Sequence, residues 1–291
     1  LVHNASGLLG GSTPSAGEVS RLDIARGEPV IGVAARVGTG PDIWGIPLDR
    51  QTGMPTGEPD VRFFSSAGEI HPRYSPDGKR VAFVSRRGGT VQLWIPDANG
   101  PSARVVTNMD ADAVVYPNWS PDGERLVFYT SGDDGFQIYI IDADGGPPQH
   151  VVPGGGPSWS SDGEHLYVTE AGAPFTVTRV RISDRHREPL FTGHLAFESA
   201  DGRQLLYWRG QETHVYMRSL DGNVAANPEE RLVETAVGGI APVDGGFYYV
   251  AVSAEGIPRA FAIYDYASRE SREIAAAPRG TMGVGGLTVS P

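Results

Sequence analysis

The sequence predicts an all-β fold assembled from short tandem repeats, and two observations carry this prediction. A Ser-Pro-Asp-Gly turn or a close variant recurs between a short strand and a β-rich run, and its Asp residues, Asp77, Asp122, Asp162 and Asp201, are spaced 45, 40 and 39 residues apart. The 39 glycines and 23 prolines among 291 residues suit many tight turns between short strands. A repeat of about 40–45 residues with several strands is typical of a β-propeller blade. We therefore expect a β-propeller of four-stranded blades.

The chain is expected to begin with a linker. Residues 1–17 are rich in Gly and Ser and are predicted to form a flexible N-terminal linker. A single β-propeller domain then spans residues 18–291. Its first blade lacks a clear turn motif, but residues 29–35 and 42–49 fill two strand positions, and residues 62–64 follow as the outer strand.

The second blade shows the complete repeat. A strand around Arg73 and Tyr74 ends at a turn in which Pro presets φ, Asp bonds to its own backbone and Gly supplies positive φ. Its other three strands are predicted at residues 80–85, 91–95 and 104–107.

The following blades repeat this order. The predicted strands after their opening strands are 126–129, 136–141 and 150–152, then 166–168, 176–182 and 189–191, then 205–208, 213–218 and 231–233, then 247–252 and 259–264. Residues 287–289 resemble the opening strand of another repeat. We expect six complete blades plus an incomplete seventh. In the six-bladed alternative, this last strand completes the first blade.

Charge and composition limit the partners. The net charge of −11 argues against nucleic-acid binding, which needs a clustered basic surface. The absence of cysteine excludes disulfides, thiolate nucleophiles and Cys-based metal sites. No apolar run approaches the ~20 residues of a membrane span, so no direct membrane insertion is expected. We expect a monomer.

The repeated acidic and aromatic residues are predicted to be structural. Asp before Gly in a turn between strands is turn chemistry, and a catalytic site would not need a copy in every blade. Tyr74, Trp119, Trp159 and Phe197 share one repeat position, and alternate strand residues face opposite sides of a sheet. We therefore expect these four rings to wedge between blades.

The candidate ligand-binding residues lie where the copies differ. The residue before each aromatic is Arg73, Asn118, Ser158 or Ala196, and the residue three before is His71, Tyr116 or Gly156. Such variation is not expected in a packed core, and the inner strand of a propeller blade begins near one mouth of the central channel. We predict that His71, Arg73, Tyr116 and Asn118 line a polar, asymmetric funnel. The alternative is a solvated channel wall without a ligand.

Catalytic motifs are missing from the sequence. It contains no Gly-x-Ser-x-Gly elbow and no phosphate-binding loop. It also lacks the His-x-x-x-His spacing of a zinc protease helix. We therefore expect a protein that is not an enzyme, with no catalytic residues, no cofactor and no metal.

The aromatic-Ser-Pro-Asp-Gly turns, together with the strand that begins Asp42-Ile43-Trp44, resemble those of the TolB-like β-propeller family, whose tandem repeats are WD-like. The strand is especially similar to propellers attached to bacterial regulators and sensor kinases. The resemblance implies a sensory or interaction module outside the cytoplasm. The family also includes metal-dependent lyases with histidines in the channel, which makes a metal at His71 and His194 conceivable.

Two classes of function follow. The first is a non-catalytic scaffold that binds a protein, a peptide or a small ligand at the channel mouth. The alternative is an enzyme-associated propeller. It would be either the gate domain of a prolyl-oligopeptidase-type hydrolase or a polysaccharide lyase that uses the channel. Fold alone does not separate them.

Overall fold

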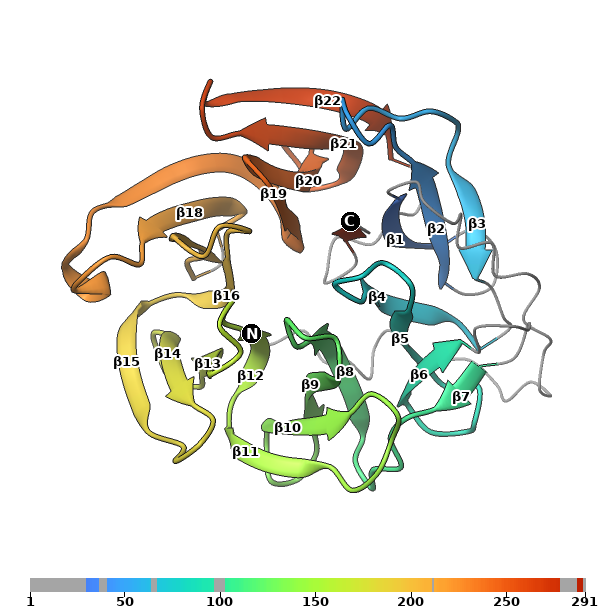
Figure 1. Cartoon of the computed structure of the whole chain (residues 1–291), viewed down its shortest axis with the longest axis vertical. Helices are drawn as coiled ribbons and strands as arrows, with labels where there is room; N and C mark the ends of the chain where they lie inside the picture. The colour runs from blue at the N-terminus through green and yellow to red at the C-terminus, as the bar shows by residue number, and fades with distance from the viewer. Residues whose placement is uncertain are drawn as a thin grey trace.

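The computed structural model describes residues 30–36, 41–63, 67–96, 103–210, 212–277 and 287–289. The linker expected at residues 1–17 lies outside these ranges. The described residues form β-strands with a single short 3₁₀ turn, η2 (Val224–Ala226). Within them, no helix is long and apolar enough to cross a membrane. Figure 1 shows the sheets arranged around a common centre, as expected for a propeller.

The strands group into antiparallel sheets in chain order. The first group is β1 (Val30–Arg36), β2 (Pro41–Pro47) and β3 (Asp60–Phe63). The second is β4 (Glu69–Tyr74), β5 (Val81–Ser85), β6 (Gln92–Pro96) and β7 (Ala103–Val105). The third is β8 (Ala113–Trp119), β9 (Arg125–Ser131), β10 (Gln137–Asp142) and β11 (Gln149–Pro153). The fourth is β12 (Gly155–Trp159), β13 (His165–Glu170), β14 (Thr176–Arg181) and β15 (Arg187–Thr192).

The remaining long sheet contains two blades joined by one strand. It runs through β16 (His194–Glu198), β17 (Gln204–Trp208), β18 (His214–Ser219), β19 (Glu229–Val243), β20 (Gly246–Val252), β21 (Pro258–Asp265) and β22 (Glu270–Ala276). The first part of β19 pairs with β18, and its last part pairs with β20 after a register shift. Strand β19 is therefore the outer strand of the fifth blade and the inner strand of the sixth.

The last strand, β23 (Thr288–Val289), closes the ring. It pairs with β1 at Ile31↔Val289 and Gly32↔Thr288, so the first sheet has the order β23-β1-β2-β3. The propeller of four-stranded blades is confirmed. Of the two expected blade counts, this pairing supports the six-bladed alternative: β23 completes the first blade instead of opening an incomplete seventh. The physical reason is that β1 would otherwise expose an unpaired inner edge.

The repeated turn is built around its Ser and Asp side chains. In all four copies the serine Oγ donates to the Asp Oδ1 at 2.5–2.6 Å. The same Oδ1 accepts the backbone N–H two residues further on, at 2.8–3.1 Å. The serine hydroxyl holds the pKa of Asp77, Asp122 and Asp201 below its ordinary value. The interpretation of these residues as turn chemistry is confirmed.

Two tryptophans lie between consecutive blades, as predicted. Trp119 and Trp159 are buried, and their indole N–H groups donate to the carbonyl oxygens of Arg73 and Asn118 in the preceding blade, at 2.9 and 3.1 Å. The guanidinium of Arg80 lies 4.6 Å from the ring centre of Trp119. Each ring therefore joins two blades through apolar burial and a directed hydrogen bond.

The fourth copy of the repeat differs from the prediction by one residue. Glu198 pairs with Leu205, just as Trp159 pairs with Leu166, three residues after the turn glycine. Glu198, rather than Phe197, therefore occupies the aromatic position. Its carboxylate reaches the preceding blade and accepts hydrogen bonds from the Ser161 N–H at 2.8 Å and the Tyr167 hydroxyl at 2.7 Å. Phe197 was misassigned because an aromatic residue was sought instead of a fixed distance from Asp-Gly.

Replacement of Trp119 with Ala is expected to destabilise the fold by about 3–5 kcal/mol, the usual cost of removing a large buried aromatic side chain. Replacement of Asp122 with Ala should cost less, about 1–2 kcal/mol, because an exposed turn loses the two hydrogen bonds that Oδ1 accepts from Ser120 and the Glu124 N–H, and water can replace both. Urea unfolding of both variants measures the difference. A near-neutral Trp119→Ala variant would contradict the inter-blade role of this ring.

Candidate functional site

Each inner strand from the second to the sixth blade contains a bulge at its start. The pairing registers of β4, β8, β12, β16 and β19 all shift there. At each shift one residue has a positive φ of 50–73°; these residues are His71, Tyr116, Gly156, Leu195 and Gly238. Three of the five are not glycine, although this backbone region is costly for residues with a Cβ. Contacts around the bulges must therefore compensate for that cost.

His71 and Tyr116 provide such contacts between the second and third blades. Both are buried, and their rings stack with centroids 4.3 Å apart. The backbone N–H of Tyr116 donates to Nδ1 of His71 at 3.5 Å. Tyr116 also stacks on Tyr129 of its own blade, with centroids 5.7 Å apart. The two left-handed residues thus form the beginning of one aromatic stack.

Arg73 and Asn118 form a second set of contacts beside this stack. The Nε of Arg73 donates to Oδ1 of Asn118 at 3.0 Å. Its Nη1 donates to the carbonyl oxygens of Pro72 at 3.0 Å and Leu287 at 2.9 Å. Asn118 in turn donates through Nδ2 to the carbonyl oxygen of Pro157 in the fourth blade, at 2.8 Å. Polar side chains therefore connect four consecutive blades, starting from the one that β23 completes.

The structure brings the four predicted site residues together but changes the interpretation of their variation. His71, Arg73 and Tyr116 are 7–8 % exposed, and Asn118 is half-buried. They do not form a solvated channel wall. Arg73, Asn118 and the neighbouring Ser158 differ in size, but all three donate hydrogen bonds between blades. The residue type at this repeat position varies because the distance from the inner strand to its hydrogen-bond acceptor in the next blade differs from blade to blade.

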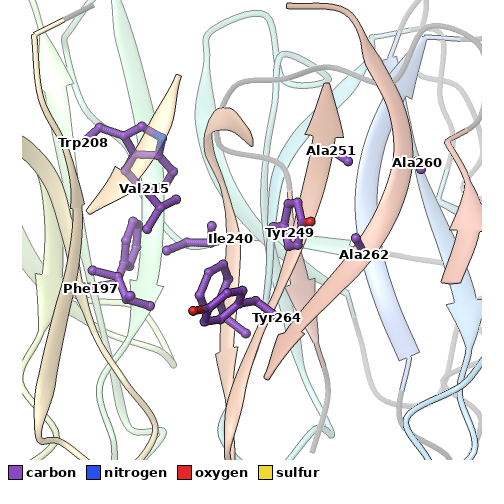
Figure 2. Packing of buried hydrophobic residues seen from close by; sticks show 11 residues of the cluster. Phe197, Trp208, Val215, Ile240, Tyr249, Ala251, Ala260, Ala262 and Tyr264 are labelled. Carbon is purple, nitrogen blue, oxygen red and sulfur yellow. The ribbon is translucent and has the colours of Figure 1, made fainter. Parts of the chain in front are cut away.

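The same position becomes apolar in the other half of the ring. Asn118, Phe197 and Ile240 each pair with the residue four positions after a turn glycine. Phe197 and Ile240 belong to one buried cluster, and Figure 2 shows them facing each other with Tyr264 beside Ile240. The centre of the ring therefore has a polar half and an apolar half.

Burial sets the charge state of the site. It lowers the pKa of His71 to about 3, with a smaller contribution from the positive charge of Arg73. Burial also lowers the pKa of Arg73 to about 10 and raises that of Tyr116. At neutral pH the cluster thus holds one cation, a neutral imidazole and a neutral phenol. Because Nδ1 of His71 accepts a hydrogen bond, its proton resides on Nε2.

Sequence reasoning did not include three participants in this site. Ser158 was recognised at the variable position but was not selected; its Oγ donates to the Ala196 carbonyl oxygen at 2.6 Å. Tyr129 had no distinguishing pattern because it lies on the second strand of its blade. Leu287 contributes a backbone oxygen, which no side-chain pattern identifies.

The possible metal ligands that lie close together in the structure are not His71 and His194, the two histidines that the family resemblance suggested. In the described part of the chain, the group of three or more possible metal ligands is Asp162, Glu164 and His165, on an exposed turn. Neither His71 nor His194 belongs to it. The pKa of His194 is lowered by burial, and its Nδ1 is buried among the described residues without a hydrogen-bond partner.

Comparison with known proteins identifies relatives of this fold. Residues 60–235 match the family model for the TolB beta propeller domain. TolB from Acinetobacter baumannii superposes with a TM-score of 0.73 at 16 % identity, covering 91 % of this chain and 67 % of that chain. A chain of the nidogen/laminin complex gives 0.69 at 15 %, and a putative TolB from Agrobacterium tumefaciens gives 0.66 at 18 %, each covering 90 % of this chain and 98 % of its own. No curated protein matches the sequence. At these identities the structural similarities show the fold alone.

Acid should destabilise the protein in part through His71. Its pKa is about 3 in the folded state against an ordinary 6.5, so between these values the unfolded chain takes up a proton that the folded chain does not. The contribution of the neutral His71 side chain to the free energy of unfolding is therefore fully present above pH 6.5. It is lost progressively as the pH falls toward 3. Urea unfolding midpoints should decline less steeply for His71→Asn, since Asn does not titrate and tolerates the left-handed backbone. Equal slopes for both proteins would rule out a buried neutral His71.

Proposed function

The chain belongs to the TolB β-propeller family, and we propose that it is a non-catalytic binding module whose ligand contacts the inner strands of the second and third blades. The observation that carries this proposal is one contiguous cluster of four polar or aromatic side chains, contributed by two adjacent blades. His71 stacks on Tyr116, and Arg73 bonds to Asn118.

The chemistry of the cluster favours a short protein segment as the ligand. Tyr116 combines an apolar ring with a polar tip, a combination common in protein recognition, and a ligand would meet the small part of it that is exposed beside His71. Arg73 supplies a fixed positive charge suited to a carboxylate. Neighbouring inner strands converge on the centre, so one inserted segment can contact several blades and be largely enclosed. A propeller of this fold also occurs in the nidogen/laminin complex, which is an assembly of proteins.

The same groups are poorly suited to catalysis near neutral pH. A general base works best when its pKa lies near the working pH, whereas the pKa of His71 is about 3. The Asp side chains of the repeated turns are bonded to Ser and backbone groups, and Asp77 has a lowered pKa for that reason. These observations favour the binding module over the lyase alternative, in which the channel itself would carry the catalytic residues.

A peptide selected from a random library on the wild-type chain is expected to bind through Tyr116. Isothermal titration should show at least about tenfold weaker binding to Tyr116→Asn, because aromatic anchors dominate such interfaces and Asn tolerates the left-handed backbone. Val105→Ala on the outer strand β7 serves as the matched rim control and should bind as wild type.

Arg73→Ala provides the second test of the same site. Peptides with a carboxylate should lose affinity for this variant more than neutral peptides do, because the guanidinium contributes charge as well as shape. Thermal melts of each variant separate weaker binding from loss of fold. Unchanged affinity for both Tyr116→Asn and Arg73→Ala, with loss in Val105→Ala, would move the binding site to the rim.

The isolated chain is expected to show no turnover of peptide, ester or uronate substrates. Chromogenic and unsaturated-product assays on purified protein provide the measurement. Turnover that disappears in His71→Asn, Asp77→Asn or His194→Asn would replace the binding-module proposal with an enzymatic one. Activity that survives in all three variants would point to a contaminant.

A further inference from the structure

Among the residues that the structure describes, the closing strand β23 pairs with β1 over two residues. Strand β23 is joined to β1 through Ile31↔Val289 and Gly32↔Thr288, whereas β4 pairs with β5 through four residue pairs. In the described residues these two pairs join β23 to a strand from the opposite end of the sequence. Contacts outside this pairing also hold β23 in the first blade.

Part of this retention is apolar. Leu287 is 1 % exposed and packs in a cluster that includes Ile31 and Ile46 of the first blade and Val250 of the sixth. The approach of the strands is close, since a Cβ at Gly32 would lie 3.0 Å from Cγ2 of Thr288. These contacts bury surface, but they do not fix the position of the strand along its own axis.

The directed contacts to β23 come from the second blade. Arg73 donates from Nη1 to the Leu287 carbonyl oxygen at 2.9 Å, and the Tyr74 N–H donates to Oγ1 of Thr288 at 3.0 Å. Arg73 is buried, and its other end is bonded to Asn118 of the third blade. A charged donor forms a stronger hydrogen bond than a neutral one, and its removal would leave the Leu287 carbonyl oxygen without this bond.

We propose that Arg73 is a latch that holds the closing strand β23 in the first blade and anchors it to the third. The first and second blades then separate only when the Arg73–Leu287 hydrogen bond breaks. Release of β23 would expose the inner edge of β1, so the latch controls local opening of the ring at this seam. Arg73 acts here as a positioning residue.

The latch also connects ring closure to ligand binding, and this step rests on the proposed function. A ligand at Arg73 and Tyr116 meets a site whose guanidinium is oriented by Leu287 of the closing segment. Such a ligand binds the closed ring more tightly than the open one. By linkage, a ligand that prefers the closed ring lowers the equilibrium population of the open ring by the same factor, so β23 is released less often.

Hydrogen exchange of the full chain, read by mass spectrometry, tests the latch without any ligand. Amides of residues 30–32 and 287–289 should exchange about tenfold faster in Arg73→Met, roughly the effect of losing one strong hydrogen bond. Thr288→Val should raise the same rates, because it removes the acceptor of the Tyr74 N–H. Arg179→Met is the matched control, since it removes a surface arginine paired with Glu188 at 2.6 Å in the fourth blade.

The outcomes separate the two proposals. Faster exchange confined to the closing seam in Arg73→Met and Thr288→Val, with wild-type rates there in Arg179→Met, supports the latch. Unchanged seam exchange in Arg73→Met, or a uniform increase over all blades, overturns it. Addition of a selected peptide should slow seam exchange in the wild type. If a peptide binds and seam exchange stays unchanged, the coupling is wrong; if no peptide binds, the proposed function fails while the latch result stands.

Discussion

A closed ring of β-sheets depends on satisfying backbone groups at its crowded centre. The inner strands of the second to sixth blades bulge there, so their regular ladders of hydrogen bonds to the neighbouring strands are interrupted. The carbonyl oxygens of Pro157, Ala196 and Leu287 are instead satisfied by side chains from adjacent blades. Buried carbonyl groups without partners would each cost a large part of a domain's net stability. The polar inner-strand side chains of the second, third and fourth blades fit this requirement, since Arg73, Asn118 and Ser158 all donate such hydrogen bonds.

The parts of the fold that depend on local chemistry could be predicted from the sequence. A Ser-Pro-Asp-Gly turn satisfies its own polar groups, so it is visible wherever it occurs, and its period predicted the propeller. The position of Trp119 and Trp159 between blades could also be predicted, because a large apolar ring that recurs at one strand position must be buried against the neighbouring sheet. Properties that depend on distant segments could not be decided: the sequence left two blade counts open, and the last strand completes the first blade in only one of them. Strand β23 belongs to the first blade because β1 would otherwise lack a partner on its inner side. The short sequence of β23 contains no information about that partner.

The variation that singles out the candidate site has a different cause from the predicted one. Variation among His71, Arg73, Tyr116 and Asn118 predicts exposed positions, whereas three of these residues are buried. A donor must match the distance and direction of its carbonyl acceptor, and the six blades are not identical, so different donors are needed in different gaps. Variation in size with a shared donor capacity is therefore the more informative pattern. It would also have identified Ser158, which donates to Ala196.

Apolar packing holds one half of the ring centre together, and directed hydrogen bonds hold the other half. Around Phe197 and Ile240 the fifth and sixth blades share β19 and pack through apolar side chains, a contact without strong directional preference. Around Arg73 and Asn118 the blades meet through directed hydrogen bonds between separate sheets. An apolar interface tolerates small displacements, whereas a directed one holds a single geometry or breaks. The polar half is therefore the side on which a closed and an open state of the proposed latch would differ in directed hydrogen bonds. A ligand can influence the ring only where it contacts groups whose geometry differs between two such states. The proposed binding residues Arg73 and Tyr116 and the closing seam lie in this same half.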